Sequence, residues 1–356
     1  MKIAFLNIYN GVINRGAEAY VFELANRLSK NNIVDVYQSG NKNGSEKYNV
    51  KTISVSWDWS KKSGDGTFLS MLFLDYWSLE ILKWSLRVSK EIIHGRYDTV
   101  MTVNGGWEPL VLRLVTWLSG SKLYISGQSG IGRDDRLNLY AMPNVFIALS
   151  SKAFAWAKKV NRFVKSVYIP NGVDLNRFNT KKINAKNTNK KTILSVGAFT
   201  EQKRHELVIE AVSELKNVNL VIAGGGGDKK QEIKVMGEKL LGKDRFEIIE
   251  TTNDKMPEIY NKANVFTLAS KTSESFGIVL VEALASGLAV VATDDPIRRE
   301  IVGEAGLFVD PTDTDAYAKA IEKALNTNWG DKPRKQAEKF SWDKIAKQYE
   351  ELFISL

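Results

Sequence analysis

Two glutamates stand eight residues apart in the segment SKTSESFGIVLVEALASGLAVVATDDPIRR (270–299). Glu274 comes just before an apolar run, and Glu282 lies inside that run. A helix that is apolar on all sides is usually buried, so the Glu282 carboxylate needs a hydrogen-bond or ionic partner. If helical geometry holds between them, the two carboxylates lie about 12 Å apart at ~1.5 Å rise per residue. Such a pair could accept hydrogen bonds from hydroxyl groups at two ends of one ligand.

The start of the expected helix supplies backbone donors between the two carboxylates. Ser275 is a candidate N-cap residue. The N–H groups of Phe276, Gly277 and Ile278 would then be free to bind an anion. Hydroxyl acceptors on both sides of a phosphate site suit a ligand made of a sugar, a diphosphate and a ribose. The alternative is structural: one surface carboxylate, and one buried carboxylate held by an arginine or a lysine.

These residues resemble the signature of a known family. Glu274 and Glu282, within ESFGIVLVEALASGLAVVAT, are similar to the paired glutamates of the retaining GT4-type glycosyltransferases, which have the GT-B fold. The resemblance implies an α/β protein with two Rossmann-like parallel-sheet domains facing a central cleft. It also implies that Glu274 accepts hydrogen bonds from the donor sugar and Glu282 from the ribose. It further implies that no metal or other cofactor is needed, because cationic side chains and a helix N-terminus stabilise the leaving group.

A second segment, VGAFTEQKR (196–204), resembles the diphosphate-binding loop of the same family. Lys203 matches the family's lysine, which neutralises the leaving diphosphate. The position of the family's arginine holds Ala198, and Arg204 is a candidate to supply the missing charge. The alternative is that Lys203 and Arg204 are a solvated pair on a loop.

Further candidate residues are placed by the resemblance alone. Arg15 and Gly16 stand where the family commonly has two glycines near a donor phosphate. Gln128 follows the expected strand KLYISG, where the family commonly has a histidine near the sugar and acceptor; glutamine can donate a hydrogen bond but cannot share a proton. Thr251 and Thr252 lie where the family places its base-recognition loop.

Apolar strand-like runs alternate with helical segments along the whole chain, which predicts parallel sheets covered by helices. The alternation restarts after the turn residues at 170–172. We therefore expect an acceptor-side domain over 1–171 and a nucleotide-sugar-binding domain over 172–339. The resemblance implies that a closing helix, 340–356, crosses back onto the first domain. Residues 181–191, rich in Lys and Asn, are expected to form an exposed connector.

Composition argues against several classes of protein. The chain has no cysteine and only two histidines, His94 and His205, so disulfides, thiolate metal sites and catalytic zinc sites have little to build from. No stretch approaches the ~20 apolar residues that a membrane span needs. The N-terminal run is more typical of a first buried strand than of a signal peptide. We therefore expect a cytoplasmic protein.

The net charge of +9 belongs to the first half of the chain. Residues 1–171 carry 22 Lys and Arg against 13 Asp and Glu, whereas the remaining residues carry 28 of each. Such asymmetry indicates an anionic partner, and an anionic membrane surface or lipid phosphate is favoured over nucleic acid. The alternative is a basic surface that only keeps the protein soluble.

Three basic or aromatic segments of the first half could contact lipid. They are the basic helix 151–164, the Lys61–Lys62 loop and an aromatic helix with Tyr76, Trp77 and Trp84. The aromatic helix could equally be a core helix. We expect a lipid-linked or glycan acceptor, and peripheral docking on the inner face of the membrane.

The sequence thus predicts a retaining, metal-independent glycosyltransferase (hexosyltransferase) that uses a nucleotide-diphosphate sugar. One alternative is a non-catalytic nucleotide-sugar-binding or scaffolding subunit, which the departures at Ala198 and Gln128 favour. Another is a nucleotide-sugar epimerase with the GT-B fold.

Overall fold

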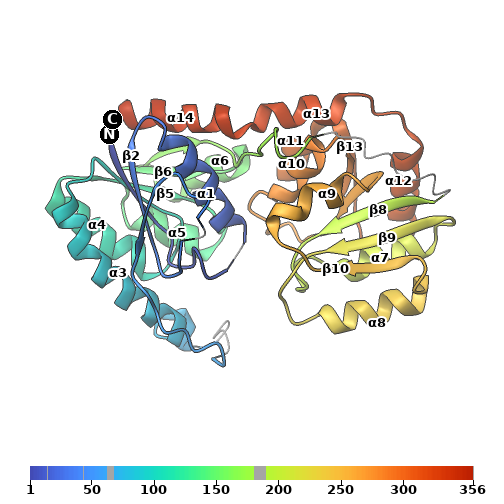
Figure 1. Cartoon of the computed structure of the whole chain (residues 1–356), viewed down its shortest axis with the longest axis horizontal. Coiled ribbons are helices and arrows are strands. Elements are labelled where there is room, and N and C mark those ends of the chain that lie inside the picture. The colour runs from blue at the N-terminus through green and yellow to red at the C-terminus, as the bar shows by residue number, and fades with distance from the viewer. Residues whose placement is uncertain (14, 43, 62–67, 180–189, 356) are drawn as a thin grey trace. The chain divides into compact units, whose positions relative to one another are not determined.

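The computed structural model of the chain describes residues 1–13, 15–42, 44–61, 68–179 and 190–355. It divides into unit 1, Met1–Asn171 with Ile345–Leu356, and unit 2, Gly172–Lys344 (Figure 1). Each unit has its own sheet and its own core. Lys62 and most of the expected connector lie outside the described residues. No helix in the described ranges is long and apolar enough to cross a membrane.

In its described residues, unit 1 holds a seven-stranded sheet of order β3-β2-β1-β4-β5-β6-β7, with every pair parallel. Its strands are β1 (Lys2–Leu6), β2 (Ile33–Gln38), β3 (Asn49–Thr52), β4 (Thr99–Thr102), β5 (Lys122–Ser126), β6 (Val145–Ala148) and β7 (Lys165–Tyr168). In the register, Leu6 lies opposite Tyr37 on one side and Thr102 on the other. The loops that follow these strands therefore gather at one edge of the sheet.

The helices of unit 1 cover this sheet. They are α1 (Gly16–Leu28), α2 (Phe68–Met71), α3 (Tyr76–Gly95), α4 (Trp107–Ser119), α5 (Arg133–Tyr140), α6 (Ser151–Val160) and α14 (Trp342–Ile354). The closing helix begins at Trp342, and its residues from Ile345 belong to unit 1. There the hydroxyl of Tyr20 donates to the hydroxyl of Tyr349 at 2.7 Å, and Phe353 packs edge-on against Tyr124.

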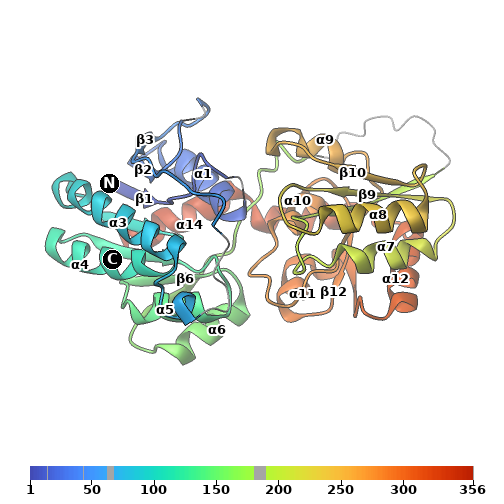
Figure 2. The ribbon, with the colours of Figure 1, turned by 90° about the horizontal axis from the view of Figure 1, so that it is seen from below.

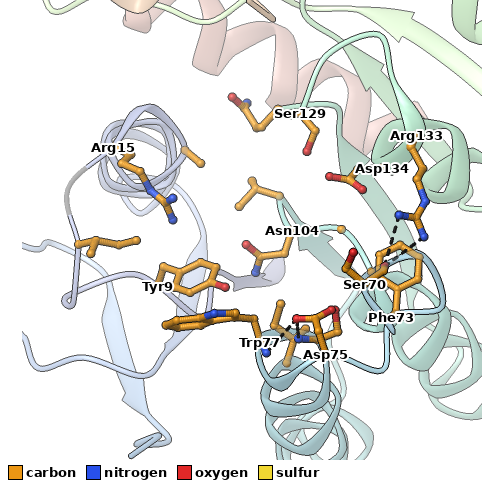
Figure 3. Close-up of a pocket in the computed structure, with 18 of the residues that line it drawn as sticks. Tyr9, Arg15, Ser70, Phe73, Asp75, Trp77, Asn104, Ser129, Arg133 and Asp134 are labelled. Carbon is orange, nitrogen blue, oxygen red and sulfur yellow. Dashed lines mark hydrogen bonds between the residues drawn. The ribbon is translucent and has the colours of Figure 1, made fainter. Parts of the chain in front are cut away.

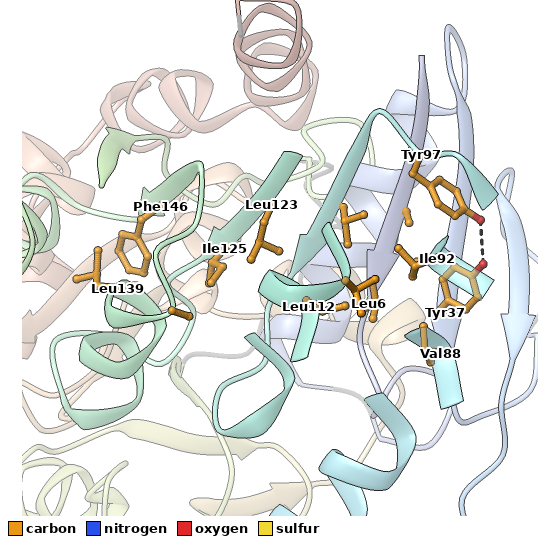
Figure 4. Packing of buried hydrophobic residues seen from close by; sticks show 14 of the residues in the cluster. Leu6, Tyr37, Val88, Ile92, Tyr97, Leu112, Leu123, Ile125, Leu139 and Phe146 are labelled. Atoms are coloured by element: carbon orange, nitrogen blue, oxygen red, sulfur yellow. Dashed lines mark hydrogen bonds between the residues drawn. The ribbon is translucent and has the colours of Figure 1, made fainter. Parts of the chain in front are cut away.

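The aromatic helix α3 is a core helix. Its residues Trp84, Val88 and Ile92 recur every four positions, and all three are fully buried. Figure 4 shows Val88 and Ile92 in this cluster. The Trp84 indole N–H donates to the carbonyl of Ile53 at 2.8 Å. The expectation that Trp84 contacts lipid is therefore wrong, since periodicity alone cannot tell a core stripe from a lipid-facing one.

In its described residues, unit 2 holds a six-stranded parallel sheet of order β10-β9-β8-β11-β12-β13. Its strands are β8 (Lys191–Val196), β9 (Val218–Ala223), β10 (Phe246–Ile249), β11 (Val265–Leu268), β12 (Ala289–Thr293) and β13 (Gly306–Val309). Both sheets share the 3-2-1-4-5-6 order of a doubly wound Rossmann-like domain. The predicted α/β class is confirmed.

Seven helices and three short 3-10 turns complete the described part of unit 2. They are α7 (His205–Ser213), α8 (Lys230–Leu241), η1 (Asn253–Lys255), α9 (Met256–Tyr260), α10 (Ile278–Ala285), α11 (Pro296–Val302), η2 (Gly303–Ala305), α12 (Thr314–Asn326), α13 (Lys332–Ala337) and η3 (Glu338–Phe340). One core lies between the sheet and the helices α7, α8 and α12 (Figure 2), with Val208, Ile233 and Tyr317 among its members. Helix α10 packs against β11 and β12, which sets the loop before it at the carboxyl edge of the sheet.

Candidate functional site

Lys203 and Glu274 form an ion pair at the carboxyl edge of the unit 2 sheet. The Nζ atom of Lys203 lies 2.6 Å from Oε2 of Glu274, and the two side chains are only 18% and 21% exposed. Gly197, directly after β8, makes room for this arrangement, because a Cβ there would lie 3.0–3.2 Å from the side-chain carbons of Lys203. Two residues 71 positions apart, both selected from the sequence, are thus brought together.

The loop that carries Glu274 differs from the expected helix start. Helix α10 begins at Ile278 and its N-cap is Gly277, not Ser275. Gly277 has a φ of +84°, a conformation that side-chain-bearing residues rarely adopt, and this turn separates Glu274 from the helix. The assumption of helical geometry between the two glutamates is therefore wrong, and the separation of about 12 Å no longer follows from it.

Helix α10 begins at Ile278, and the N–H of Leu280 already donates to the carbonyl of Gly277 at 2.9 Å, so the free N–H groups of the helix lie before Leu280. The anion site expected at the N–H groups of Phe276, Gly277 and Ile278 stays a prediction. Phe276 is 1% exposed and packs against Phe340, with ring centroids 5.9 Å apart. The side chain of Phe276 thus packs against the protein just before the helix, and Gly277 forms the turn.

Glu282 is half-buried on α10 and has a hydrogen-bond partner. The hydroxyl of the buried Tyr260 donates to Oε2 of Glu282 at 2.9 Å. Burial, together with the Glu282 carboxylate, holds the pKa of Tyr260 well above its ordinary value, so the phenol remains a donor. One partner of this carboxylate is thus a tyrosine, and the role of Glu282 toward a ribose stays a prediction.

Arg204 holds strand ends together. Its Nε donates to the carbonyl of Ala269 at 2.7 Å, and its guanidinium also reaches the carbonyl of Ser270 and the hydroxyl of Thr293. These contacts join the carboxyl ends of β11 and β12. Its expected role as a second diphosphate cation stays a prediction, and in the structure its guanidinium is engaged by these three groups.

A second arginine, Arg298, was not selected from the sequence. It is 1% exposed, pairs with Asp295, and donates to the hydroxyl of Ser270 at 2.6 Å and to the carbonyl of Lys271 at 2.8 Å. It fixes the chain just before Glu274. The signal in the sequence was an arginine close to an N-capping aspartate, which is too common to single out.

His205 follows Lys203 by two positions in the sequence and is buried. Desolvation is the main cause that lowers the pKa of its imidazole to about 4, so the ring is neutral at pH 7. Its Nδ1 lies 3.3 Å from the hydroxyl of Ser195. His94 is exposed near the end of α3 and bonds the carbonyl of Lys90.

The remaining residues selected from unit 2 are the two threonines after β10. Thr251 is half-buried and Thr252 is exposed, just before the turn η1. The structure brings neither into contact with Lys203 or Glu274, and their role in base recognition stays a prediction.

Two of the site residues selected from unit 1, but not Gly16, line a cavity of about 740 Å³. Arg15 is the N-cap of α1, which begins at Gly16, and its guanidinium lies 5.2 Å from the ring centroid of Tyr9. Gln128 forms a reciprocal amide pair with Asn171, with both hydrogen bonds at 3.2 Å, and also donates to Ser126. Arg15 and Gln128 both line the cavity, at the carboxyl edge of the sheet.

Other residues of this cavity were not selected from the sequence. Figure 3 shows Tyr9 and Trp77 on one side, Asp134 and Arg133 on another, and Asn104 between them. They come from four separate loops and helix starts, so no local motif marks them. The cavity volume is within the ordinary range for small-molecule sites, roughly 300–1,000 Å³.

Comparison with known proteins places the unit 2 site in a family. Residues 176–341 match the family described as glycosyl transferases group 1. This segment is a group 1 glycosyltransferase domain. It contains Lys203, Glu274 and Glu282, and the resemblance to GT4-type glycosyltransferases is confirmed on it.

Two relatives extend the similarity. The chain is 30% identical over 251 residues to an uncharacterized glycosyltransferase of Methanocaldococcus jannaschii, covering 62% of this chain and 64% of that protein. It is 29% identical over 215 residues to the phosphatidyl-myo-inositol mannosyltransferase of Mycolicibacterium smegmatis, covering 57% and 55%. The chain thus spans between half and two thirds of the length of these relatives.

Solved structures show the same fold. HepE of Anabaena, in complex with UDP and glucose, superposes with a TM-score of 0.81 at 17% identity, covering 100% of both chains. Sucrose-phosphate synthase of Thermosynechococcus elongatus gives a TM-score of 0.78 at 19% identity, covering 99% of this chain and 98% of that one. The predicted GT-B fold is confirmed, and at this identity the likeness concerns the fold alone.

Proposed function

We propose that the protein is a retaining, metal-independent glycosyltransferase that transfers a sugar from a nucleotide-diphosphate sugar to a glycan or lipid-linked acceptor. The observation that carries this proposal is the half-buried ion pair of Lys203 and Glu274 inside the group 1 domain. HepE, which has the same fold, was crystallised with UDP-glucose. That complex supports a nucleotide diphosphate as the leaving group.

The ion pair can do two things at once. Glu274 holds the ammonium group of Lys203 in place before a donor arrives, which reduces the cost of ordering a long side chain. When the donor binds, Lys203 can stabilise the negative charge that develops on the diphosphate, and Glu274 can accept hydrogen bonds from the transferred sugar. Glu282, held by Tyr260, is the proposed acceptor for the ribose hydroxyls.

The variant Lys203→Ala tests this assignment. We expect it to weaken a nucleoside diphosphate at least tenfold and the matching monophosphate much less, because the diphosphate loses a partly desolvated cation. The matched control is Lys271→Ala, which removes a more exposed lysine paired with Glu201 in the same unit. Thermal-shift titration with UDP, GDP and ADP and their sugars gives the affinities. Equal weakening of both ligands would contradict the role of Lys203.

A second candidate function is a non-catalytic nucleotide-sugar-binding subunit. The observation that favours it is Gln128, whose amide is fully engaged by Asn171 and Ser126, at a position where the family commonly has a histidine. Hydrolysis of a bound nucleotide sugar, with and without an added acceptor, separates the two functions. Binding without turnover for every donor would favour the subunit.

We also propose that unit 1 docks on an anionic membrane surface from the cytosol. Exposed apolar side chains on α2 and α4 support this in place of the buried Trp84. They are Phe68, Leu69, Met71, Leu110, Leu114, Trp117 and Leu118. The named activity of the mycobacterial relative, on phosphatidyl-myo-inositol, agrees with a membrane-borne acceptor.

A further inference from the structure

The cavity of unit 1 has a preformed aromatic wall. Tyr9, Trp59 and Trp77 line it, and the ring centroids of the two tryptophans are 5.5 Å apart. Trp57 stacks on Tyr9 at 5.3 Å and on Trp77 at 5.5 Å. Trp59 is nevertheless 58% exposed. A rigid aromatic surface that remains open to water is suited to cover the apolar face of a ligand.

The opposite side of the cavity carries hydrogen-bond acceptors. The side-chain amide of Asn104 donates to Glu108 at 3.0 Å, which fixes its orientation, and no donor among the described residues bonds its Oδ1. Asp134 is exposed and has no ion-pair partner in the described ranges. It lies beside Gly105, where an added Cβ would come within 3.3 Å of the Asp134 Cβ. Figure 3 shows Asn104 between Tyr9 and Asp134.

The charges around the cavity do not favour an anion. Three carboxylates line it, from Glu18, Asp75 and Asp134, against two guanidinium groups, from Arg15 and Arg133. Arg15 lies 3.8 Å from Glu18, whose carboxylate also accepts from the Arg15 backbone N–H at 3.0 Å. The excess of basic residues in the first half of the chain is therefore not found in this cavity.

The second guanidinium is engaged by the protein. Arg133 donates to the carbonyl groups of Ser70 and Met71 and lies 4.5 Å from the ring centroid of Phe73. A phosphate in the cavity would compete with these contacts for Arg133 and would face the three carboxylates. A neutral ligand with hydroxyl groups meets no such cost, since hydroxyls can donate to carboxylates.

We propose that this cavity binds a neutral sugar ring of the acceptor, with its C–H face against Trp59 and Trp77 and its hydroxyls donating to Asp134 and Asn104. This inference rests on the proposed glycosyl transfer and specifies the acceptor for it. The sugar can belong to a free glycan or to a lipid-linked one; in both cases the group that enters the cavity is uncharged.

Binding of acceptor fragments to the full chain, without nucleotide, tests the inference. The probes are the methyl glycosides of glucose, galactose, mannose and N-acetylglucosamine, compared with myo-inositol 1-phosphate and glycerol 3-phosphate, by saturation-transfer NMR and calorimetry. We expect at least one glycoside to bind and both phosphates to bind more weakly. Trp59→Ala should weaken that glycoside at least tenfold. Tyr140→Ala is the matched control, since Tyr140 is 57% exposed on α5 and does not line the cavity.

Two smaller changes and one comparison complete the test. Asp134→Asn and Gly105→Ala should each weaken the glycoside severalfold, and thermal melting should show that both variants remain folded. If a glycoside with a long alkyl chain binds as tightly as the methyl glycoside, the acceptor is a free glycan. If the long-chain glycoside binds more tightly, the acceptor is a lipid-linked sugar.

Tighter binding of either phosphate than of every glycoside would overturn the inference, and so would the absence of glycoside binding at millimolar concentration. If nucleoside diphosphates still bind in that case, the proposed transferase function stands and only the acceptor assignment fails. If the protein binds a glycoside but no nucleoside diphosphate, the acceptor cavity stands and the proposed transferase function fails.

Discussion

The loop after the first strand of each sheet has a different task in the two units. In unit 1, the chain after β1 brings Tyr9 and Arg15 to the edge of an aromatic cavity. In unit 2, the chain after β8 brings Lys203 to Glu274. The strand order around the two positions is the same. A shared topology therefore sets where a site can form, and the loop residues decide whether it handles charge or apolar surface.

The buried ionisable groups also differ between the two units. In unit 1, burial raises the pKa of Glu108 to about 7 and that of Asp135 to about 8. In unit 2, burial lowers the pKa of His205 to about 4. Both effects disfavour the charged form, but they make the two units respond to pH in opposite directions.

The largest expected effect concerns Glu274. Glu274→Gln should lower kcat by about 10²–10³-fold, the loss of roughly 2.7–4 kcal/mol expected for one preorganised polar contact to the transition state. The affinity for the bare nucleoside diphosphate should change much less than kcat, because losing the carboxylate loosens Lys203 but also frees its ammonium group for the diphosphate. Steady-state kinetics and nucleotide titration measure the two quantities. Glu201→Gln, at the exposed partner of Lys271, is the control, and turnover within threefold of wild type would contradict the assignment.

The second effect is the pH dependence of stability. Glu108 has a folded pKa above its unfolded value of about 4.5, so its contribution to stability is present below that pH and is lost as pH rises through about 7. His205 has a folded pKa below its unfolded value of about 6.5, so stability is lost as pH falls from 6.5 towards 4. Each effect amounts to at most about 3 kcal/mol.

Two variants isolate these terms. Relative to wild type, Glu108→Gln should gain stability as pH rises from 5 to 8, and His205→Gln should gain stability as pH falls from 6.5 to 4. Denaturant unfolding at several pH values gives the free energies of unfolding. Parallel pH profiles for wild type and either variant would show that the buried group does not titrate as assigned.

A third change tests the space that Gly197 leaves for Lys203. Gly197→Ala places a methyl group against the Lys203 side chain, so we expect the nucleoside diphosphate to bind about tenfold more weakly, or about 1.4 kcal/mol. Gly225→Ala is the matched control, because nothing lies within 4 Å of a Cβ there. Unchanged affinity in the Gly197 variant would mean that Lys203 does not need its present side-chain conformation to bind the diphosphate.

The smallest expected effect per residue concerns membrane binding. Charge reversal at Lys158, Lys159 and Lys165 should weaken co-sedimentation with anionic vesicles, since each basic residue near such a surface contributes about 1 kcal/mol. Leu114→Glu should weaken it as well by removing apolar contact. Binding should also fade as salt rises. No vesicle binding at low salt, with ready transfer to a soluble sugar, would sink the membrane proposal.

The sequence was sufficient to select Lys203 and Glu274 of the ion pair, but it was insufficient to select most residues of the unit 1 cavity. Lys203 and Glu274 stand in loops with recognisable local patterns, so each could be selected from its neighbours along the chain. The start of α10 was misplaced because the positive φ of Gly277 is a backbone property that apolar periodicity does not reveal. The contacts of Arg204 with strand ends were missed for a related reason, since they depend on three-dimensional neighbours.

The aromatic wall could not be predicted because its members are distant in sequence. Tyr9 follows β1, Trp59 follows β3 and Trp77 belongs to the first turn of α3, and only the sheet order brings them together. The edge strand β7 has no strong apolar pattern either, because Lys165–Tyr168 is short and only partly buried. Exposed edge strands carry little apolar signal.

The packing of α14 on unit 1 has a consequence for biosynthesis. Tyr349 and Phe353 fill positions against Tyr20 and Tyr124, so the core of unit 1 is complete only when the last part of the chain has left the ribosome. Unit 2 is one continuous segment and needs no later residues. Although N-terminal domains generally fold first during synthesis, here the second unit can reach its final form earlier. Until then, the nascent first unit exposes the side chains of Tyr20 and Tyr124 that α14 covers, and chaperones can bind there.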